Sequence, residues 1–193
     1  MAKLYFYYSS MNAGKSTTLL QAAFNYEERG METMLWTAGL DNRSGQGIIG
    51  SRIGLEREAH CFEDDTDLLA AIGEEHADRP LNCVLIDEAQ FLSKAQVFQL
   101  ARVCDELKIP VLAYGLRTDF QAELFPGSAQ LLAIADELVE LKAICFCGAK
   151  ATMNMRVDAD GKPVRAGAQT EIGGNDRYIA LCRMHYMEFM ERL

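Results

Sequence analysis

Two kinds of apolar pattern alternate along the first 140 residues. Runs of four or five largely apolar residues are typical of buried strands. They occupy residues 4–8, 33–37, 83–86, 110–114 and 138–141. Between them, apolar residues recur at helical spacing within 15–29, 67–76, 93–107 and 128–135. This alternation predicts parallel β-α-β units, with helices on both faces of one sheet.

Local signals refine these elements. Ser93 followed by Gln96 predicts a capping box at the start of the third helix. Residues 40–54 contain four glycines and little apolar periodicity, so we expect a mobile loop there.

The pattern changes after residue 142, where cysteines appear beside shorter and more polar segments. Residues 151–157 resemble a strand, and Asp160-Gly161 predicts a hairpin turn. A glycine-rich loop at 166–176, a strand ending at Leu181 and a short helix follow. We therefore expect an α/β domain at 1–142 and a small second domain at 143–193.

Composition narrows the classes of function. The chain has 193 residues, 49% hydrophobic, with a net charge of −9 and a pI near 4.9. This acidity opposes binding to nucleic-acid backbones but allows one nucleotide to bind. No apolar run reaches about 18 residues and no signal peptide is evident, so we expect a cytoplasmic protein with reduced thiols and no membrane contact.

The segment from Ser9 to Ser16, SSMNAGKS, lies between a predicted strand and a predicted helix. That context favours a phosphate-binding P-loop, in which backbone N–H groups and Lys15 hold phosphates and Ser16 binds Mg²⁺. Ser9 stands where the motif usually has glycine. The alternative is a helix start that contains Gly-Lys-Ser by chance.

The run 83–86 ends in two acids, Asp87 and Glu88. A buried strand that ends in an acid resembles a Walker B segment, which would place Asp87 near a metal ion. Glu88 could then act as a base on a hydroxyl or a water. The alternative is a pair of solvated carboxylates.

Three cysteines and a histidine form two close pairs, Cys145 with Cys147 and Cys182 with His185. Four such ligands predict a structural zinc site. A disulfide or a set of buried thiols would be the alternatives.

Weaker candidates lie in the loops. Asp41, Arg43 and Arg52 fall in the glycine-rich segment, where an arginine could either reach phosphate or be solvated. Three phenylalanines follow predicted strand ends and suggest a base-stacking pocket, although aromatic residues more often form core. They are Phe91, Phe120 and Phe125.

Taken together, these motifs resemble the zinc-containing thymidine kinases of bacteria and animal cytosol, over nearly the whole chain. The matching segments are 9–16, 87–91, 114–120 and 173–178, together with the four metal ligands. Ser9 and the Cys-x-Cys pair look more like the enterobacterial branch. The resemblance implies a RecA-like P-loop fold, a zinc-held "lasso" loop, transfer of the ATP γ-phosphate to the thymidine 5′-hydroxyl, inhibition by thymidine triphosphate (dTTP) and a homotetramer.

The resemblance also implies roles for individual residues, with Glu88 as the general base. The implied ATP- and phosphate-binding residues are Ser9, Ser10, Met11, Asn12, Ala13, Gly14, Lys15, Ser16, Asp87, Glu88, Ala89 and Gln90. The implied nucleoside-binding residues are Met11, Phe91, Leu116, Phe120, Phe125, Thr170, Glu171, Ile172, Gly173 and Tyr178. Asn154 falls where relatives present a threonine toward the base.

Two other functions compete with this hypothesis. The segment Asp-Glu-Ala-Gln also looks like a helicase box, which suggests a nucleic-acid-dependent ATPase. Helicases usually need two such domains, and the negative charge opposes this function. The third possibility is a regulator that binds a nucleotide and is held together by zinc but does not catalyse a reaction. Glu88 argues against this possibility.

Overall fold

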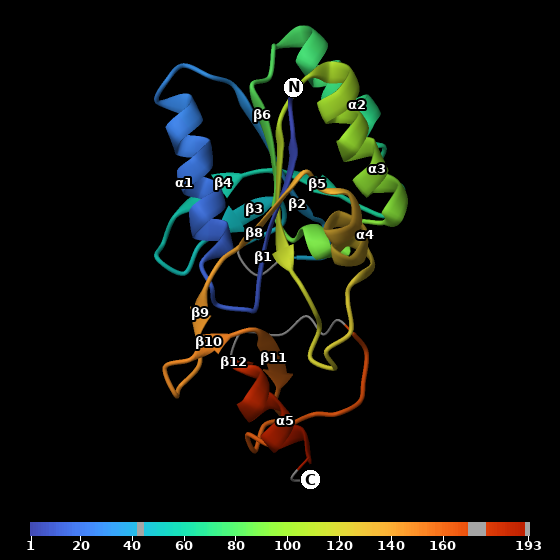
Figure 1. Cartoon of the computed structure of the whole chain (residues 1–193). Helices are drawn as coiled ribbons and strands as arrows, with labels where there is room; N and C mark the ends of the chain where they lie inside the picture. The colour runs from blue at the N-terminus through green and yellow to red at the C-terminus, as the bar shows by residue number, and fades with distance from the viewer. Residues whose placement is uncertain (42–44, 170–176, 192–193) are drawn as a thin grey trace.

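The computed structural model describes residues 1–41, 45–169 and 177–191, and its centre is a six-stranded parallel sheet (Figure 1). The strands follow the order β5-β2-β6-β7-β1-β8, and every neighbouring pair is parallel. They are β1 (Leu4–Ser9), β2 (Thr33–Ala38), β5 (His60–Phe62), β6 (Cys83–Ile86), β7 (Val111–Leu116) and β8 (Glu137–Glu140).

Helices cover both faces of this sheet (Figure 1). On one face lies α1 (Lys15–Glu27); on the other lie α2 (Leu68–Asp78), α3 (Lys94–Arg102) and α4 (Pro126–Ile134). The central strand β6 serves both cores, because Cys83 and Leu85 join the cluster under α1 while Val84 and Ile86 join the opposite one. The predicted α/β fold with a parallel sheet between two helical layers is confirmed.

Side-chain caps set the starts of two helices. The Asp67 carboxylate accepts a hydrogen bond from the Ala70 backbone N–H at 3.0 Å before α2, and Ser93 and Gln96 form the predicted capping box before α3. The helix predicted over 93–107 changes geometry within its length. It continues beyond Arg102 as a π-helical segment, η2 (Val103–Leu107).

The expectation of a loop over 40–54 is wrong in part. Strand β3 (Ile48–Gly50) pairs antiparallel with β4 (Glu56–Glu58), next to the sheet. The pairing forms because Ile49 is buried against the core under α1, although glycines flank the Ile48-Ile49 pair on both sides. The short edge strand β5 also escaped prediction, since three residues carry almost no periodic signal.

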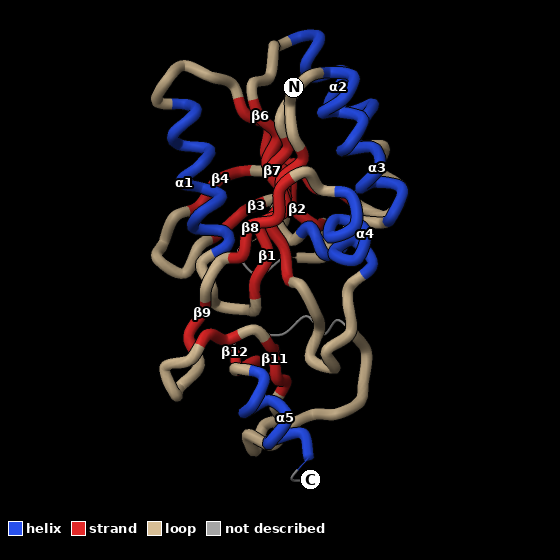
Figure 2. The backbone as a smooth tube through the Cα atoms, in the orientation of Figure 1, coloured by secondary structure: helices blue, strands red, loops and turns tan. Residues whose placement is uncertain are grey.

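The C-terminal part lies beside the carboxyl edge of the sheet (Figure 2). It contains β9 (Ala143–Ile144), β10 (Lys150–Ala151), β11 (Met153–Arg156), β12 (Tyr178–Leu181) and α5 (Arg183–Glu191). The chain turns at Asp158–Lys162, where Gly161 takes a φ of 77°, as expected for the predicted hairpin turn. This part has its own apolar cluster, which includes Met155 and Tyr186. A domain division at residue 142 stays a prediction.

None of the helices in the described ranges is long and apolar enough to cross a membrane.

Candidate active site

The loop between β1 and α1 closes around the side chain of Lys15. Gly14 precedes α1 with a φ of 78°, a left-handed conformation that glycine adopts without steric cost. The Lys15 ammonium donates hydrogen bonds to Ser9 Oγ at 3.2 Å and to the Ser10 carbonyl at 3.1 Å. A lysine held over the loop at a helix N-terminus is the arrangement that binds phosphate.

Asp87 follows β6 and is buried beside the start of α1. The Ser16 hydroxyl donates a hydrogen bond to Asp87 Oδ2 at 2.9 Å. Burial, and then the charge of Glu88, raise the pKa of the Asp87 carboxyl to about 7, although the hydrogen bond from Ser16 opposes this rise. The Ser16 hydroxyl and the buried Asp87 carboxylate present oxygen atoms side by side. Oxygen atoms are the ligands that Mg²⁺ prefers, so the pair fits this ion.

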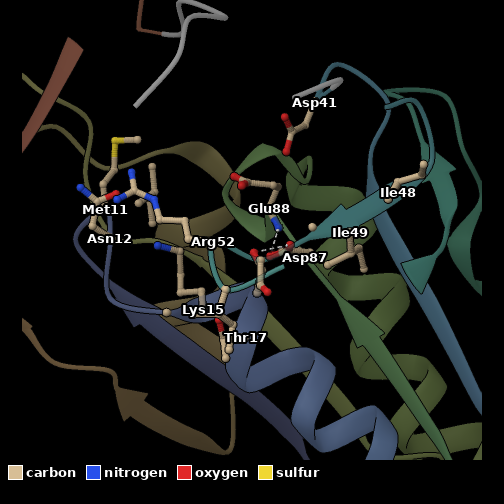
Figure 3. A pocket seen from close by; sticks show the side chains of 16 residues that line it. Met11, Asn12, Lys15, Thr17, Asp41, Ile48, Ile49, Arg52, Asp87 and Glu88 are labelled. Atoms are coloured by element: carbon tan, nitrogen blue, oxygen red, sulfur yellow. Dashed lines mark hydrogen bonds between the residues drawn. The ribbon is translucent and has the colours of Figure 1, made fainter. Parts of the chain in front are cut away.

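Glu88 has a left-handed backbone conformation, with a φ of 52°. This costs a residue with a side chain about 1–2 kcal/mol, so the surrounding contacts must hold it in place. Its backbone N–H donates to Asp87 Oδ1 at 3.0 Å, and its carboxylate accepts a hydrogen bond from the Gln90 side-chain amide. Glu88 is 8% exposed, and its carboxylate faces the same cavity as Lys15 (Figure 3).

These groups surround a cavity of about 450 Å³ (Figure 3). Its walls come from the P-loop, the two acids after β6, the end of β7, and the segment around β3. The lining residues are Met11, Asn12, Gly14, Lys15, Ser16, Thr17, Asp41, Ile48, Ile49, Gly50, Ser51, Arg52, Ile53, Asp87, Glu88 and Leu116. Its size suits a small ligand.

The segment 48–53 is the part of this wall that the sequence did not predict, except for Arg52 as an undecided candidate. The alternation of Ile49 with more exposed neighbours was the available signal, but glycines on both sides obscured it.

The predicted metal ligands meet in the C-terminal part. Nδ1 of His185 lies 3.4 Å from Cys145 Sγ and 3.3 Å from Cys182 Sγ, and the sulfurs of Cys147 and Cys182 are 3.9 Å apart. All four ligand atoms lie within 4.8 Å of one another. Zinc bonds of about 2.3 Å to sulfur and 2.0 Å to nitrogen give tetrahedral edges of roughly 3.5–3.8 Å, so the group fits Zn²⁺.

The thiol chemistry agrees with a metal site, because the thiolate is the form that binds a metal ion. Burial opposes ionisation of Cys145, but the backbone N–H groups of Cys147 and Cys182 and the His185 ring outweigh it and lower the pKa of the thiol to about 6. All six cysteines are free.

Comparison with known proteins identifies the family. The family model described as "Thymidine kinase" matches residues 2–186. The chain belongs to the thymidine kinase family. A protein named thymidine kinase from Zymomonas mobilis is 68% identical over the full length of both chains. Another, from Novosphingobium aromaticivorans, is 70% identical over 98% of this chain and 99% of its own.

Among solved structures, the Pif1 helicase of Candida albicans matches 74% of this chain and 36% of its own, with 15% identity and a TM-score of 0.41. This likeness is too weak to bear on function. Membership of the thymidine kinase family identifies the protein as a kinase and replaces the hypotheses of an ATPase and of a non-catalytic regulator.

Five residues of the phosphate-binding set expected for a thymidine kinase do not line this cavity. Ser9 and Ser10 are buried behind the loop, where the Ser10 hydroxyl donates to the Ala151 carbonyl at 3.2 Å. Ala89 and Gln90 are buried in the short 3₁₀ helix η1 (Ala89–Phe91). Ala13 packs against the apolar cluster of the C-terminal part.

Of the nucleoside-binding residues that the resemblance to thymidine kinases implies, Met11 and Leu116 line the cavity. The rings of Phe91 and Phe125 pack edge to face with centroids 5.7 Å apart. Phe120 is buried, and the Arg156 guanidinium lies 4.0 Å above its ring. Tyr178 lies in β12 opposite Arg156. The other four members, Thr170, Glu171, Ile172 and Gly173, fall outside the described residues.

Asn154 connects three segments of this thymidine kinase. Its side-chain oxygen accepts a hydrogen bond from the Met11 backbone N–H at 2.8 Å, and its side-chain nitrogen donates to the Thr118 carbonyl at 2.8 Å. The buried amide thus holds the P-loop against β11.

Proposed function

We propose that this chain transfers the γ-phosphate of ATP to the 5′-hydroxyl of thymidine. The supporting observation is that Lys15, the Ser16–Asp87 pair and Glu88 meet at one cavity in a chain of the thymidine kinase family. Phosphoryl transfer needs a cation for the phosphates, a metal site and a group that accepts the hydroxyl proton, and these residues supply all three.

The residues divide the reaction between them. Lys15 and the start of α1 hold the phosphates, and Glu88 accepts the proton of the 5′-hydroxyl as its oxygen bonds to the γ-phosphorus. The bond from that phosphorus to the β-phosphate oxygen breaks, and ADP leaves. Ser16 and Asp87 would hold Mg²⁺, which offsets the phosphate charge when bound.

A second cation faces the phosphate side of the cavity. Arg52 extends from the turn after β3 toward Lys15 (Figure 3). A guanidinium there would contact the transferred phosphoryl group, where charge develops during transfer.

The family resemblance supports further parts of the proposal. Phe91, Phe120, Phe125 and Tyr178, with the segment 170–173, would join Met11 and Leu116 around the nucleoside. Thymidine triphosphate would inhibit the enzyme, a homotetramer would be the working form, and nucleoside salvage in the cytoplasm would be its role. The Cys145–His185 group would hold one structural zinc.

Phosphate transfer from γ-labelled ATP to a panel of nucleosides tests the proposal. We expect labelled thymidine monophosphate and little product from purine nucleosides. If labelled phosphate reached only water, or if DNA were needed for ATP turnover, the assignment would be wrong.

A further inference from the structure

Gln90 connects Glu88 to the neighbouring strand. It lies in η1, two residues after Glu88, and is 1% exposed. Its side-chain nitrogen donates a hydrogen bond to the Glu88 carboxylate, and its side-chain oxygen accepts one from the Leu116 backbone N–H at 3.0 Å. Leu116 ends β7 and lines the cavity, so Gln90 joins two walls of the site.

The chemistry of the partners fixes the orientation of this amide. A backbone N–H can only donate, so the oxygen of Gln90 must face Leu116. The nitrogen then faces Glu88, whose carboxylate oxygen accepts its hydrogen bond. With the oxygen and the nitrogen of its side-chain amide both engaged inside the protein, Gln90 is poorly placed for the phosphate contact that the family resemblance implies.

Gly115 provides the space for this contact. A Cβ atom at Gly115 would lie 2.9 Å from the Gln90 backbone nitrogen and 3.0 Å from its side-chain oxygen. Both distances are at or below the limit of normal carbon contacts. The glycine therefore lets η1 approach β7 closely enough for the amide to reach the Leu116 N–H.

We infer that Gln90 is a positioning residue that holds the Glu88 carboxylate in the orientation needed to accept the proton of the 5′-hydroxyl. The inference rests on the proposed function, in which Glu88 is the base. It acts through Glu88 because this residue has a costly left-handed backbone conformation that surrounding contacts must hold in place. The hydrogen bond from Gln90, itself anchored on the end of β7, is one such contact and acts directly on the carboxylate.

A neutral amide suits this position better than a charged residue. A lysine or arginine would pair with Glu88 and weaken it as a base, while an acid would add a third negative charge beside Asp87 and Glu88. Glutamine donates a hydrogen bond and adds no net charge.

The experiment compares Gln90→Met with Gln96→Met. Gln96 is the matched control: it is also buried, its side chain bonds to the Ser93 backbone N–H and to the carbonyls of Glu63 and Thr66, and it does not line the cavity. We expect Gln90→Met to lower kcat roughly 10–100-fold, because misplacing a catalytic group by about 1 Å can cost about 100-fold. The KM values for ATP and thymidine should change less than about threefold, and Gln96→Met should keep kcat within about twofold.

A double-mutant cycle separates positioning from a general structural effect. In the Glu88→Gln background, Gln90→Met should change the residual rate less than about threefold, because the group it orients is already gone. An equal loss in both backgrounds, a normal kcat, or a loss confined to the KM for ATP would each overturn the inference.

Two further arms keep the result interpretable. If Gln90→Met does not fold, Gly115→Ala takes its place, because the added methyl group displaces the Gln90 amide without deleting it. A normal kcat in folded Gly115→Ala would also overturn the inference. Wild-type enzyme that transfers no phosphate to thymidine would contradict the proposed function itself. Wild-type turnover with an unaffected Gln90→Met variant would contradict this inference alone.

Discussion

At the scale of single residues, the site depends on two adjacent acids with different surroundings. Asp87 is enclosed beside α1 and bonded by Ser16, whereas Glu88 turns toward the cavity from a left-handed backbone position. The same two-residue sequence thus places one carboxylate beside the Ser16 hydroxyl and the other toward the cavity, as the proposed metal-binding and base roles require.

Replacing Glu88 by glutamine tests the base. The amide keeps the size of the side chain but cannot accept the hydroxyl proton, so kcat should fall about 10²–10⁴-fold while ATP still binds. Steady-state kinetics combined with calorimetric titration of ATP would measure both effects. Turnover close to that of the wild type would rule out this role.

The burial of Asp87 predicts a pH-dependent stability in magnesium-free buffer. Because burial and the Glu88 charge raise the folded-state pKa of this carboxyl from 3.8 to about 7, the folded protein keeps a proton that the unfolded chain releases between about pH 4 and 7. The associated stability is present at low pH and is lost as the pH rises through 7.

Asp87→Asn removes this titration. The gain in melting temperature of the variant over the wild type should therefore be larger at pH 8 than at pH 5. Scanning calorimetry at the two pH values measures the difference, and an equal difference at both would contradict the assigned ionisation.

At the scale of elements, the β3–β4 hairpin places a cation at the phosphate side of the cavity. The turn is closed by the Ser51 N–H donating to the Leu55 carbonyl at 2.8 Å and by the Leu55 N–H donating to Ser51 Oγ at 2.9 Å. Arg57 of β4 bonds to Glu27 of α1 through two nitrogens. This half-exposed pair adds at most about 1 kcal/mol but gives the hairpin a second attachment besides Ile49.

Arg52→Ala should therefore weaken phosphoryl transfer. We expect kcat/KM for ATP to fall at least about tenfold, with partial recovery in Arg52→Lys, which keeps the charge but loses the planar fork. Arg57→Ala in the same hairpin serves as the control and should stay within about twofold. Equal losses in Arg52→Ala and Arg57→Ala would show that the hairpin matters only as a cover.

At the scale of the whole molecule, the C-terminal part is attached directly to the P-loop. Asn154 bonds to the Met11 N–H and Ala151 accepts from the Ser10 hydroxyl, while Cys145 and Cys182 lie in the same apolar cluster as Ala151. A metal at the cysteine group would therefore stabilise the surroundings of the phosphate loop as well as its own turns.

Cys182→Ser tests this connection. Metal analysis of protein purified without added metal should find about one zinc per chain in the wild type and little in the variant. We also expect a lower melting temperature and a raised KM for ATP, because the contacts to Ser10 and Met11 loosen. A disulfide in place of zinc would contradict the site.

Sequence patterns predicted most of the fold and singled out most of the residues that meet at the site. Continuous apolar runs and helical spacing predicted the layered parallel sheet, because strands covered on both faces are apolar throughout, whereas a surface helix buries one face. Residue type and spacing singled out the segment 9–16, Asp87, Glu88 and the group of three cysteines and His185, and the structure brings the first three together at one cavity and the last four into one cluster. Their roles toward phosphate, magnesium and zinc stay predictions. The division at residue 142 and the nucleoside-binding roles stay predictions.

Only the tertiary structure decided which of these residues face the cavity. The family resemblance implies that Gln90 contacts phosphate, yet its side-chain amide is bonded between Glu88 and Leu116. Conversely, the segment around Ile49 became a strand beside the cavity because burial against α1 outweighed the weak strand preference of its glycines. Sequence patterns report local period and chemistry, whereas the direction of a side chain depends on close approaches between distant segments, such as Gly115 against Gln90.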